Sequence, residues 1–422
     1  MNEMHFLFLN AYFDPESIAF SHLENDLISF VCSLENSITV ICPTPTRGVT
    51  QEVIHKYKKI KLEKRNDEKL TVKRFWAPQE RKKTLIRAVR YLWCNFREFQ
   101  LAKKEKNIDL VFSNSTPPTQ GLLCGLVAKQ LSKRYKRKVP FVYSLQDIFP
   151  DSLVYTGLTH KGSLIWKIGR VIENITYKNA DKIIVISEGF KKNIMAKGVP
   201  EEKIVVIPNW VDENKVINVP REENTLFDKY DLDRNKFYVC YSGNIGFTQN
   251  MEALCYAAKK LESEENIGIV IVGDGAFKPQ LEKMISEQKI KNITLIPFQD
   301  YSDISKVFSL GDVGLIISKA GIGVNSVPSK TWSIMSAERP VLACFDLDSE
   351  LCEIVKTNNC GVCVSPDDVD ALVCAIKDMK NAREENIRMG QNGRQYILEK
   401  LGKDMCTGKY VDVFKKCAEE IQ

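Results

Sequence analysis

The chain has 422 residues, a hydrophobic content of 44% and a formal net charge of +6. This length predicts two domains of roughly 200 residues each, since a single core rarely grows larger. No apolar run approaches the roughly 18 to 20 residues that span a bilayer, and the segment from Met1 to Asn10 enters a strand pattern without a charged leader. These features speak against a membrane-spanning or secreted protein, so we expect a cytoplasmic one.

Short β-branched runs alternate with helical patterns along the first half, which is typical of parallel βαβ units. We expect strands at His5–Asn10, Ser37–Cys42, Val72–Trp76, Leu110–Asn114, Phe141–Leu145, Lys182–Ile186 and Ile204–Ile207.

Positive charge is concentrated in one part of this first half. Between Lys56 and Lys138 there are 24 Lys and Arg against 7 Asp and Glu, a local charge of +17 that leaves −11 for the remainder. Such a basic end favours an anionic partner. No helix-turn-helix, RNP or zinc-knuckle pattern is present, so we do not expect a nucleic-acid partner.

The segment 84–104 in this basic region predicts a helix with one apolar stripe. A basic amphipathic helix of this kind can lie on an anionic membrane surface. The alternative is a helix whose stripe faces the core, which the stripe alone favours. The basic neighbourhood favours the membrane. The stripe consists of Leu85, Val89, Leu92, Phe96 and Phe99, and Arg87, Arg90, Arg97 and Lys103 flank it.

A second series of strands follows a polar stretch that we interpret as a linker and capping segment. The predicted domains are 1–210, the linker 211–235, a second domain 236–404 and a last helix 405–422 that either closes the second domain or crosses back to the first. The fold class is α/β, with two tandem Rossmann-like domains. The second series of strands is Phe237–Ser242, Ile269–Val272, Ile293–Ile296, Val313–Ile317, Val341–Phe345 and Val362–Val364.

Ligands bind at the carboxyl ends of parallel strands, and several such ends here carry turn chemistry. Glycine there permits close backbone approach or a positive φ. None of these turns fits GxGxxG or GxxxxGK[ST], so a dinucleotide-dependent dehydrogenase and a P-loop ATPase are disfavoured. The three turns are Gly243-Asn244-Ile245-Gly246, Gly273-Asp274-Gly275 and Ser318-Lys319-Ala320-Gly321-Ile322-Gly323.

The segment VPSKTWSIMSAERPVLA, from Val327 to Ala343, predicts a turn, a helix and a short strand. Pro328 stands where the helix begins, and Ser329 and Lys330 lie at its positive end. Unpaired amide N–H groups, the helix dipole and a cationic side chain all favour a phosphate or diphosphate there. The alternative is a surface helix with a solvated lysine.

Several segments together resemble the GT-B glycosyltransferases of family 4, and within them the WbuB-like branch of capsule, O-antigen and colanic acid synthesis. The resemblance spans nearly the whole chain, and its most specific parts are the DIFPD and PSK segments. It rests on FLNAYFDPES (8–17), SLQDIFPDSLVYTGL (144–158), ADKIIVISEGFKKNI (180–194), KIVVIPNWVD (203–212), SGNIGFTQNMEAL (242–254), IVGDGAFKPQLE (271–282), ITLIPFQDYSDISKVFSLGDVGLI (293–316) and VPSKTWSIMSAERPVLA (327–343).

This resemblance implies a two-domain GT-B enzyme with an interdomain cleft, whose second domain holds a UDP- or GDP-sugar. It places Gly243, Asn244 and Gly246 at the diphosphate or donor sugar. Ser329 and Lys330 receive the diphosphate, and Lys319 is a secondary cation. The turn Gly273, Asp274 and Gly275 borders the base together with Phe298.

In the first domain the resemblance brings Asp147 to acceptor or donor hydroxyls, with Asp151 supporting it and Glu16 a candidate for acceptor contact. A purely structural reading has Asp147 or Asp151 capping the next helix. Family members generally retain the anomeric configuration without a convincing protein nucleophile, so we name none. They usually need no metal. We expect no metal and no cofactor, and we expect the DxD-like Asp346-Leu347-Asp348 to cap a helix.

The chain departs from the family pattern at the phosphate helix. The family carries a Glu-x7-Glu pattern, whose positions correspond here to Asn325 and Ser333, so both carboxylates are absent. The second glutamate ordinarily holds the ribose. A cation expected after the Gly243 turn is also replaced by Thr248 or Gln249, which leaves Lys330 as the leading positive charge.

Three functions remain open from the sequence. The first is a retaining transferase that acts on a polyprenyl-diphosphate-linked sugar acceptor at the inner face of the cell membrane. The second is a nucleotide-sugar 2-epimerase, disfavoured because no histidine is available for proton transfer in the expected site. The third is a non-catalytic, membrane-associated nucleotide-sugar-binding protein.

Overall fold

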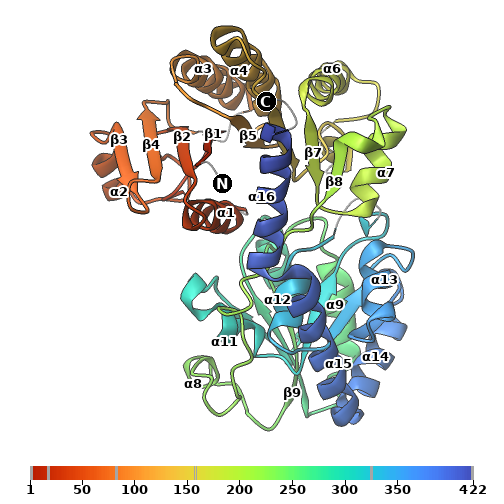
Figure 1. Ribbon diagram of the computed structural model, residues 1–422. Coiled ribbons are helices and arrows are strands. Elements are labelled where there is room, and N and C mark those ends of the chain that lie inside the picture. The colour runs from red at the N-terminus through yellow and green to blue at the C-terminus, as the bar shows by residue number, and fades with distance from the viewer. Residues whose placement is uncertain are drawn as a thin grey trace. The chain divides into compact units, whose positions relative to one another are not determined.

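The computed structural model describes residues 3–16, 20–80, 84–155, 157, 159–323 and 327–419. The chain divides into two compact units (Figure 1). The first unit combines Met1–Pro208 with Asp404–Gln422, and the second is Asn209–Lys403.

An eight-stranded sheet forms the first unit, in the order β3-β4-β2-β1-β5-β6-β7-β8. Every neighbouring pair is parallel except β3 and β4, which are antiparallel. All strands expected in this half are present; β3 was not expected. The strands are β1 His5–Leu9, β2 Ser37–Pro43, β3 Leu62–Arg65, β4 Leu70–Phe75, β5 Leu110–Asn114, β6 Phe141–Leu145, β7 Lys182–Val185 and β8 Ile204–Val206.

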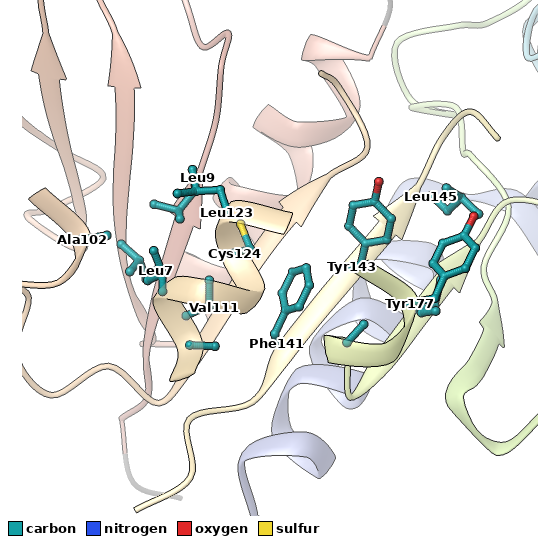
Figure 2. Close-up of a cluster of buried hydrophobic side chains, with 14 of the residues drawn as sticks. Leu7, Leu9, Ala102, Val111, Leu123, Cys124, Phe141, Tyr143, Leu145 and Tyr177 are labelled. Atoms are coloured by element: carbon teal, nitrogen blue, oxygen red, sulfur yellow. The ribbon is translucent and has the colours of Figure 1, made fainter. Parts of the chain in front are cut away.

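Helices cover both faces of this sheet. On one face the core includes Leu7 and Leu9 of β1, Phe141 of β6, and Leu123 and Cys124 of α4 (Figure 2). The helices are α1 Ser21–Ser33, α2 Gln51–Tyr57, α3 Thr84–Ala102, α4 Gln120–Tyr135, α5 Asp151–Tyr155, α6 Leu164–Asn179, α7 Glu188–Ala196 and α16 Lys403–Glu419.

The last helix, α16, packs on the opposite face. Phe414 of α16 lies with its ring centroid 5.4 Å from that of Phe6 and 5.1 Å from that of Phe112. Phe6 and Phe8 alternate with the residues of β1 that face the other core, as the side chains of a strand must. The chain end therefore contributes to the core of the first unit.

The structure distinguishes the two alternatives for the apolar stripe of α3. Val89, Leu92 and Phe96 are all more exposed than buried, so the alternative in which this stripe faces the core is wrong for these three residues. Phe99 does pack against the core. Arg90, expected to flank the stripe at the surface, is buried, and it donates to the carbonyl of Pro78 and to Thr46 Oγ1. The side chain of Leu85 lies outside the described part.

The second unit contains a six-stranded parallel sheet in the order β11-β10-β9-β12-β13-β14. Each strand expected here is present. The strands are β9 Phe237–Ser242, β10 Ile267–Val272, β11 Ile293–Ile296, β12 Val313–Ile317, β13 Val341–Cys344 and β14 Gly361–Val364; the α-helices are α8 Leu226–Lys229, α9 Met251–Lys260, α10 Lys278–Glu287, α11 Ile304–Phe308, α12 Lys330–Ser336, α13 Glu350–Thr357, α14 Val369–Asn381 and α15 Arg383–Tyr396.

Residues 211–235, interpreted from the sequence as a linker and capping segment, pack in the second unit. Leu226, Phe227 and Leu232 join a cluster with Tyr238 of β9 and Val270 of β10. Across the described ranges, no helix combines the length and the apolar character needed to cross a bilayer.

Candidate functional site

The chain adds strands to the second sheet first on one side of β9 and then on the other, so that β9 has β10 on one side and β12 on the other. In open α/β sheets such a switch point is where ligands bind, beyond the carboxyl ends of the strands. The loop 243–246 follows β9, the loop 273–275 follows β10, and α12 begins at Lys330. The site is therefore built by loops that one sheet edge brings together.

Lys330 reaches back to the end of β9. Its Nζ donates to the hydroxyl of Tyr241 at 2.8 Å and lies 3.9 Å from the centroid of the same ring. A β-carbon added at Gly243 would lie 3.2 Å from this Nζ. Lys330 thus sits directly against the loop after β9.

No carboxylate of the described residues lies within ion-pair distance of Lys330. Burial lowers the pKa of Lys330 to about 7, because the charged ammonium loses water without gaining a carboxylate. Lys330 as a whole residue is half-buried. A desolvated cation without an anionic partner is what an anion-binding site requires.

Close backbone packing accounts for two of the glycines. Gly243 has a φ of +137°. At Gly273 a β-carbon would lie 2.0 Å from the carbonyl oxygen of Gly243, and at Gly275 it would lie 2.3 Å from that of Ile245. The loop after β10 can approach the loop after β9 only because these positions lack a side chain. This explains Gly273 and Gly275 without a ligand.

Most amide groups of the loop after β9 already have partners. The N–H of Gly243 donates to the carbonyl of Val272 at 2.9 Å, and that of Gly246 donates to Gln249 Oε1 at 3.0 Å. The N–H of Ile245 donates to the carbonyl of Asp274 at 2.8 Å. The amides of Gly243 and Gly246 are therefore already bonded within the protein, and Lys330 is the leading candidate for a contact with a diphosphate.

The remaining candidate residues of the second unit differ in their exposure and in whether their side chains already have partners. Ser329 is exposed and its side chain makes no capping bond, whereas Ser333 is half-buried one turn along α12 from Lys330. The Nζ of Lys319 lies 3.3 Å from Glu252, so its charge is partly compensated. Asn325 lies outside the described residues.

Two further candidates border the loop region. Phe298, just after β11, is 76% exposed, and Asp274 is exposed with Oδ1 accepting from the N–H of Gly275 at 2.8 Å. Asn244 is the exposed residue of its loop, and its carbonyl accepts from the Tyr241 hydroxyl at 2.6 Å.

Asp346 has a different role from the helix cap expected of the Asp346-Leu347-Asp348 segment. Its two carboxylate oxygens accept the N–H groups of Gly321 at 2.9 Å and Gly323 at 2.6 Å. Ser349 is the residue that caps α13. Asp346 therefore braces the loop after β12.

The candidates in the first unit do not form one cluster. Asp147 is exposed after β6, and its carboxylate accepts from Ser152 and from the N–H of Ile148. Asp151, the first residue of α5, pairs with Lys197 Nζ at 2.7 Å. That pairing ties Asp151 to the end of α7, whereas the carboxylate of Asp147 has other partners.

Glu16 is almost completely buried. Its Oε1 accepts the N–H groups of Thr46 at 2.7 Å and Arg47 at 2.8 Å, and burial raises its pKa. Glu16 therefore holds the segment after β2, and its burial does not fit the expected acceptor contact.

Sequence reasoning missed Tyr241. Its hydroxyl lies between Lys330 Nζ and the carbonyl of Asn244, so it fixes both the lysine and the loop. No motif signals it, because a tyrosine near the end of a buried strand is more often a core residue.

Two family models match the chain. The model described as Glycosyltransferase Family 4 matches residues 29–215, and the model described as Glycosyl transferases group 1 matches residues 222–396.

Individual relatives agree with these models. WcaI of Escherichia coli (strain K12), assigned as a glycosyl transferase of colanic acid biosynthesis, is 30% identical over 64% of this chain and 66% of its own length. WbjE of Pseudomonas aeruginosa, assigned as a glycosyltransferase, is 25% identical over 66% of this chain and 68% of its own length. The chain thus spans about two thirds of each relative.

Solved structures show the same fold. The Anabaena protein HepE, crystallised with UDP and glucose, superposes with a TM-score of 0.71 over 98% of this chain and all of its own, at 17% identity.

Proposed function

Because this chain belongs to the GT-B glycosyltransferases of family 4, we propose that it transfers a sugar from a nucleotide-sugar to an acceptor in the synthesis of a bacterial surface polysaccharide. The observation that carries this proposal is Lys330, a desolvated cation without an anionic partner among the described residues, seated on Tyr241 at the switch point of the second sheet. The assignment of WcaI to colanic acid biosynthesis supports the pathway class.

The donor is a UDP- or GDP-sugar whose diphosphate lies against Lys330 and the hydroxyl of Ser329. A charge-assisted hydrogen bond from a lysine to a phosphate is among the stronger polar contacts in proteins. Phe298 offers an exposed ring for stacking near the base. The UDP bound to HepE, a protein of the same fold, supports a uridine nucleotide.

The chemical step releases a nucleoside diphosphate, on which negative charge develops as the glycosidic bond breaks. A fixed cation at that position stabilises the transition state more than the ground state. We propose that transfer retains the anomeric configuration and that the leaving phosphate accepts the proton of the attacking hydroxyl. No protein nucleophile and no metal enter this scheme.

The acceptor is a sugar linked to a polyprenyl diphosphate at the inner face of the cell membrane. Asp147, an exposed residue just after β6, is the candidate for contact with acceptor hydroxyls. The local charge of +17 between Lys56 and Lys138 supports an anionic membrane as partner.

A thermal-shift screen with UDP, GDP, ADP and their sugar conjugates tests the donor half of this proposal. A ligand that binds the folded state raises Tm by mass action. We expect UDP- or GDP-sugars to raise it and ADP-sugars to have little effect. Incubation with the stabilising donor and a lipid-linked acceptor then releases free nucleoside diphosphate. Donor binding without release on any acceptor would favour a non-catalytic binding protein.

A further inference from the structure

Helix α6 carries a row of aliphatic side chains that the described residues do not cover. The opposite side of the helix packs inward, with Gly169 against Pro150 and Thr176 against the position of Gly121. The outward row recurs at the spacing of one helical face and is between 40% and 73% exposed. It consists of Leu164, Ile165, Ile168, Val171 and Ile175.

A second apolar row lies on α3 and contains aromatic residues. Trp93 donates its indole N–H to the carbonyl of Trp76, and their ring centroids lie 6.1 Å apart. The side of α3 that faces the protein holds Arg90, Cys94 and Glu98. The exposed row, between 37% and 65% exposed, is Val89, Leu92, Trp93 and Phe96.

Helix α4 lies between these two helices on the same face of the sheet (Figure 1). Asn95 of α3 donates to Gln120 of α4 at 3.2 Å, and a β-carbon at Gly125 of α4 would meet the side chain of Asn179 of α6 at 2.8 Å. Leu126 of α4 is 48% exposed. We call the exposed residues of α3, α4 and α6 the three-helix surface.

The exposed charged residues described on α3, α4 and α6 are all basic. These helices contain nine Lys or Arg, of which only Arg90 is buried, and two acids, Glu98 and Glu173, both of which are buried. Five basic residues are exposed, namely Lys129, Lys133, Arg134, Lys167 and Lys178. Arg87, Arg97 and Arg170 are half-buried, and of these Arg87 pairs with Glu80 and Arg170 with Glu173. Apolar rows beside cations, with no exposed acid among the described residues of α3, α4 and α6, match the interface of an anionic bilayer.

We propose that the three-helix surface docks onto an anionic lipid bilayer, with the aliphatic row of α6 and the aromatic row of α3 entering the headgroup region. The basic side chains contact lipid phosphates. A second copy of this chain is a poorer occupant, because it would bring two cationic surfaces together. The inference rests on the proposed function only in that the acceptor would lie in the same membrane.

Cosedimentation with vesicles tests the docking directly, without any substrate. The double variant Ile168→Ser/Val171→Ser removes the centre of the α6 row. We expect it to bind phosphatidylcholine vesicles that contain phosphatidylglycerol about tenfold or more weakly, since each buried aliphatic side chain contributes to partitioning. The control Ile387→Ser/Leu398→Ser changes two similarly exposed residues of the second unit and should bind as the parent does.

Separate experiments test the contribution of the basic side chains to vesicle binding and the depth to which the three-helix surface enters the bilayer. Lys133→Gln/Lys167→Gln/Lys178→Gln should weaken vesicle binding about tenfold at low salt and little at high salt. Brominated acyl chains should quench the part-exposed Trp93 but not the buried Trp210 and Trp332.

Two results would overturn the docking. In the first, the α6 variant binds anionic vesicles as tightly as the parent. In the second, the parent binds no vesicles and is a dimer that the α6 variant dissociates, which would make the three-helix surface an interface between copies.

Failure of the docking and failure of the proposed function give different results. Donor binding by thermal shift and transfer to a water-soluble acceptor need no bilayer, so they persist in the α6 variant if only docking is lost. Vesicle binding by a chain that binds no nucleotide-sugar would instead contradict the proposed function and leave the docking intact.

Discussion

Burial of the Lys330 ammonium destabilises the folded protein, and a role in ligand binding explains why the residue is nevertheless present. Its ammonium is desolvated, and its partners among the described residues are a tyrosine hydroxyl and ring. A surface lysine would have kept its water, and a structural buried lysine would have a carboxylate beside it. An arriving diphosphate would supply the missing charge.

The first prediction concerns donor affinity. Lys330→Met should weaken binding of the nucleotide-sugar by about 1.5 to 3 kcal/mol, the range for a hydrogen bond to a charged group. Calorimetry measures the change, with Lys319→Met as the control because that lysine already pairs with Glu252. Equal losses in the two variants would mean that Lys330 has no special role.

The second prediction concerns pH. The pKa of Lys330 is about 7 in the free protein, and a bound diphosphate raises it by favouring the charged form. Affinity for a nucleotide-sugar, whose own charge is constant in this range, should be highest below pH 7. It should fall by up to about tenfold per pH unit as the pH rises above 7. Calorimetry in buffers of different ionisation enthalpy should detect proton uptake on binding at pH 8, and a flat profile from pH 6 to 9 would argue against the assignment.

The third prediction concerns stability. A lysine in the unfolded chain has a pKa of about 10.4, so between pH 7 and that value the unfolded state binds more protons and the cost of Lys330 grows as the pH falls. Lys330→Met should therefore raise Tm at pH 7 to 8 and leave it nearly unchanged above about pH 11. A lower Tm at pH 7 would show that the contact with Tyr241 stabilises more than burial destabilises.

For individual residues, the sequence predicts candidates for the site but not their burial or their hydrogen-bond partners. Lys330 was identified from a helix start after a proline. Tyr241 was not, and the partners of Glu16 and Asp151 were unforeseen, because burial and hydrogen bonding depend on which strands neighbour each other.

At the scale of elements, the position of α12 depends on a glycine in the strand beneath it. A β-carbon at Gly314 of β12 would lie 2.4 Å from Cγ2 of Ile334 in α12. The helix can therefore lie close to the sheet and bring Lys330 to the end of β9.

The fourth prediction tests this contact. Gly314→Ala should cost about 1 to 3 kcal/mol of stability by overpacking, and it should weaken donor binding because α12 is displaced. Ile334→Ala removes the atoms that would clash, so the double variant should be less destabilised than the sum of the two single changes. Chemical denaturation measures the cycle. Simple additivity would mean that the two positions do not interact.

Element prediction from sequence succeeded where burial imposes a pattern. Runs such as Ile269–Val272 are buried on both sides and stand out in the sequence. The missed strand β3, LEKR, is an edge strand with alternating exposure and no apolar run. The apolar stripe of α3 could not by itself predict its direction, because periodicity shows that a helix has two sides but not which of them meets the sheet. Only the basic neighbourhood favoured the outward direction.

At the scale of the molecule, the C-terminal helix packs in the unit that the N-terminal half of the chain forms. After the second unit, α16 completes the core of the first unit, and the hydroxyl of Tyr410 lies 3.0 Å from Ser144 Oγ of β6. Sequence left both positions of this helix open, because an amphipathic helix fits any apolar surface.

The fifth prediction follows from this connection. Phe414 is fully buried among Phe6, Phe8 and Phe112, so Phe414→Ala should cost about 3 to 5 kcal/mol. The loss should fall on the first unit although the residue follows the second unit in sequence. Hydrogen exchange should show reduced protection in β1 and β5, with β9 and β10 unchanged. Phe227→Ala, which removes an equally buried ring from the second unit, should do the reverse. If Phe414→Ala instead released protection equally in all four strands, the two units would unfold as one cooperative body, and the stability of the second unit would depend on α16.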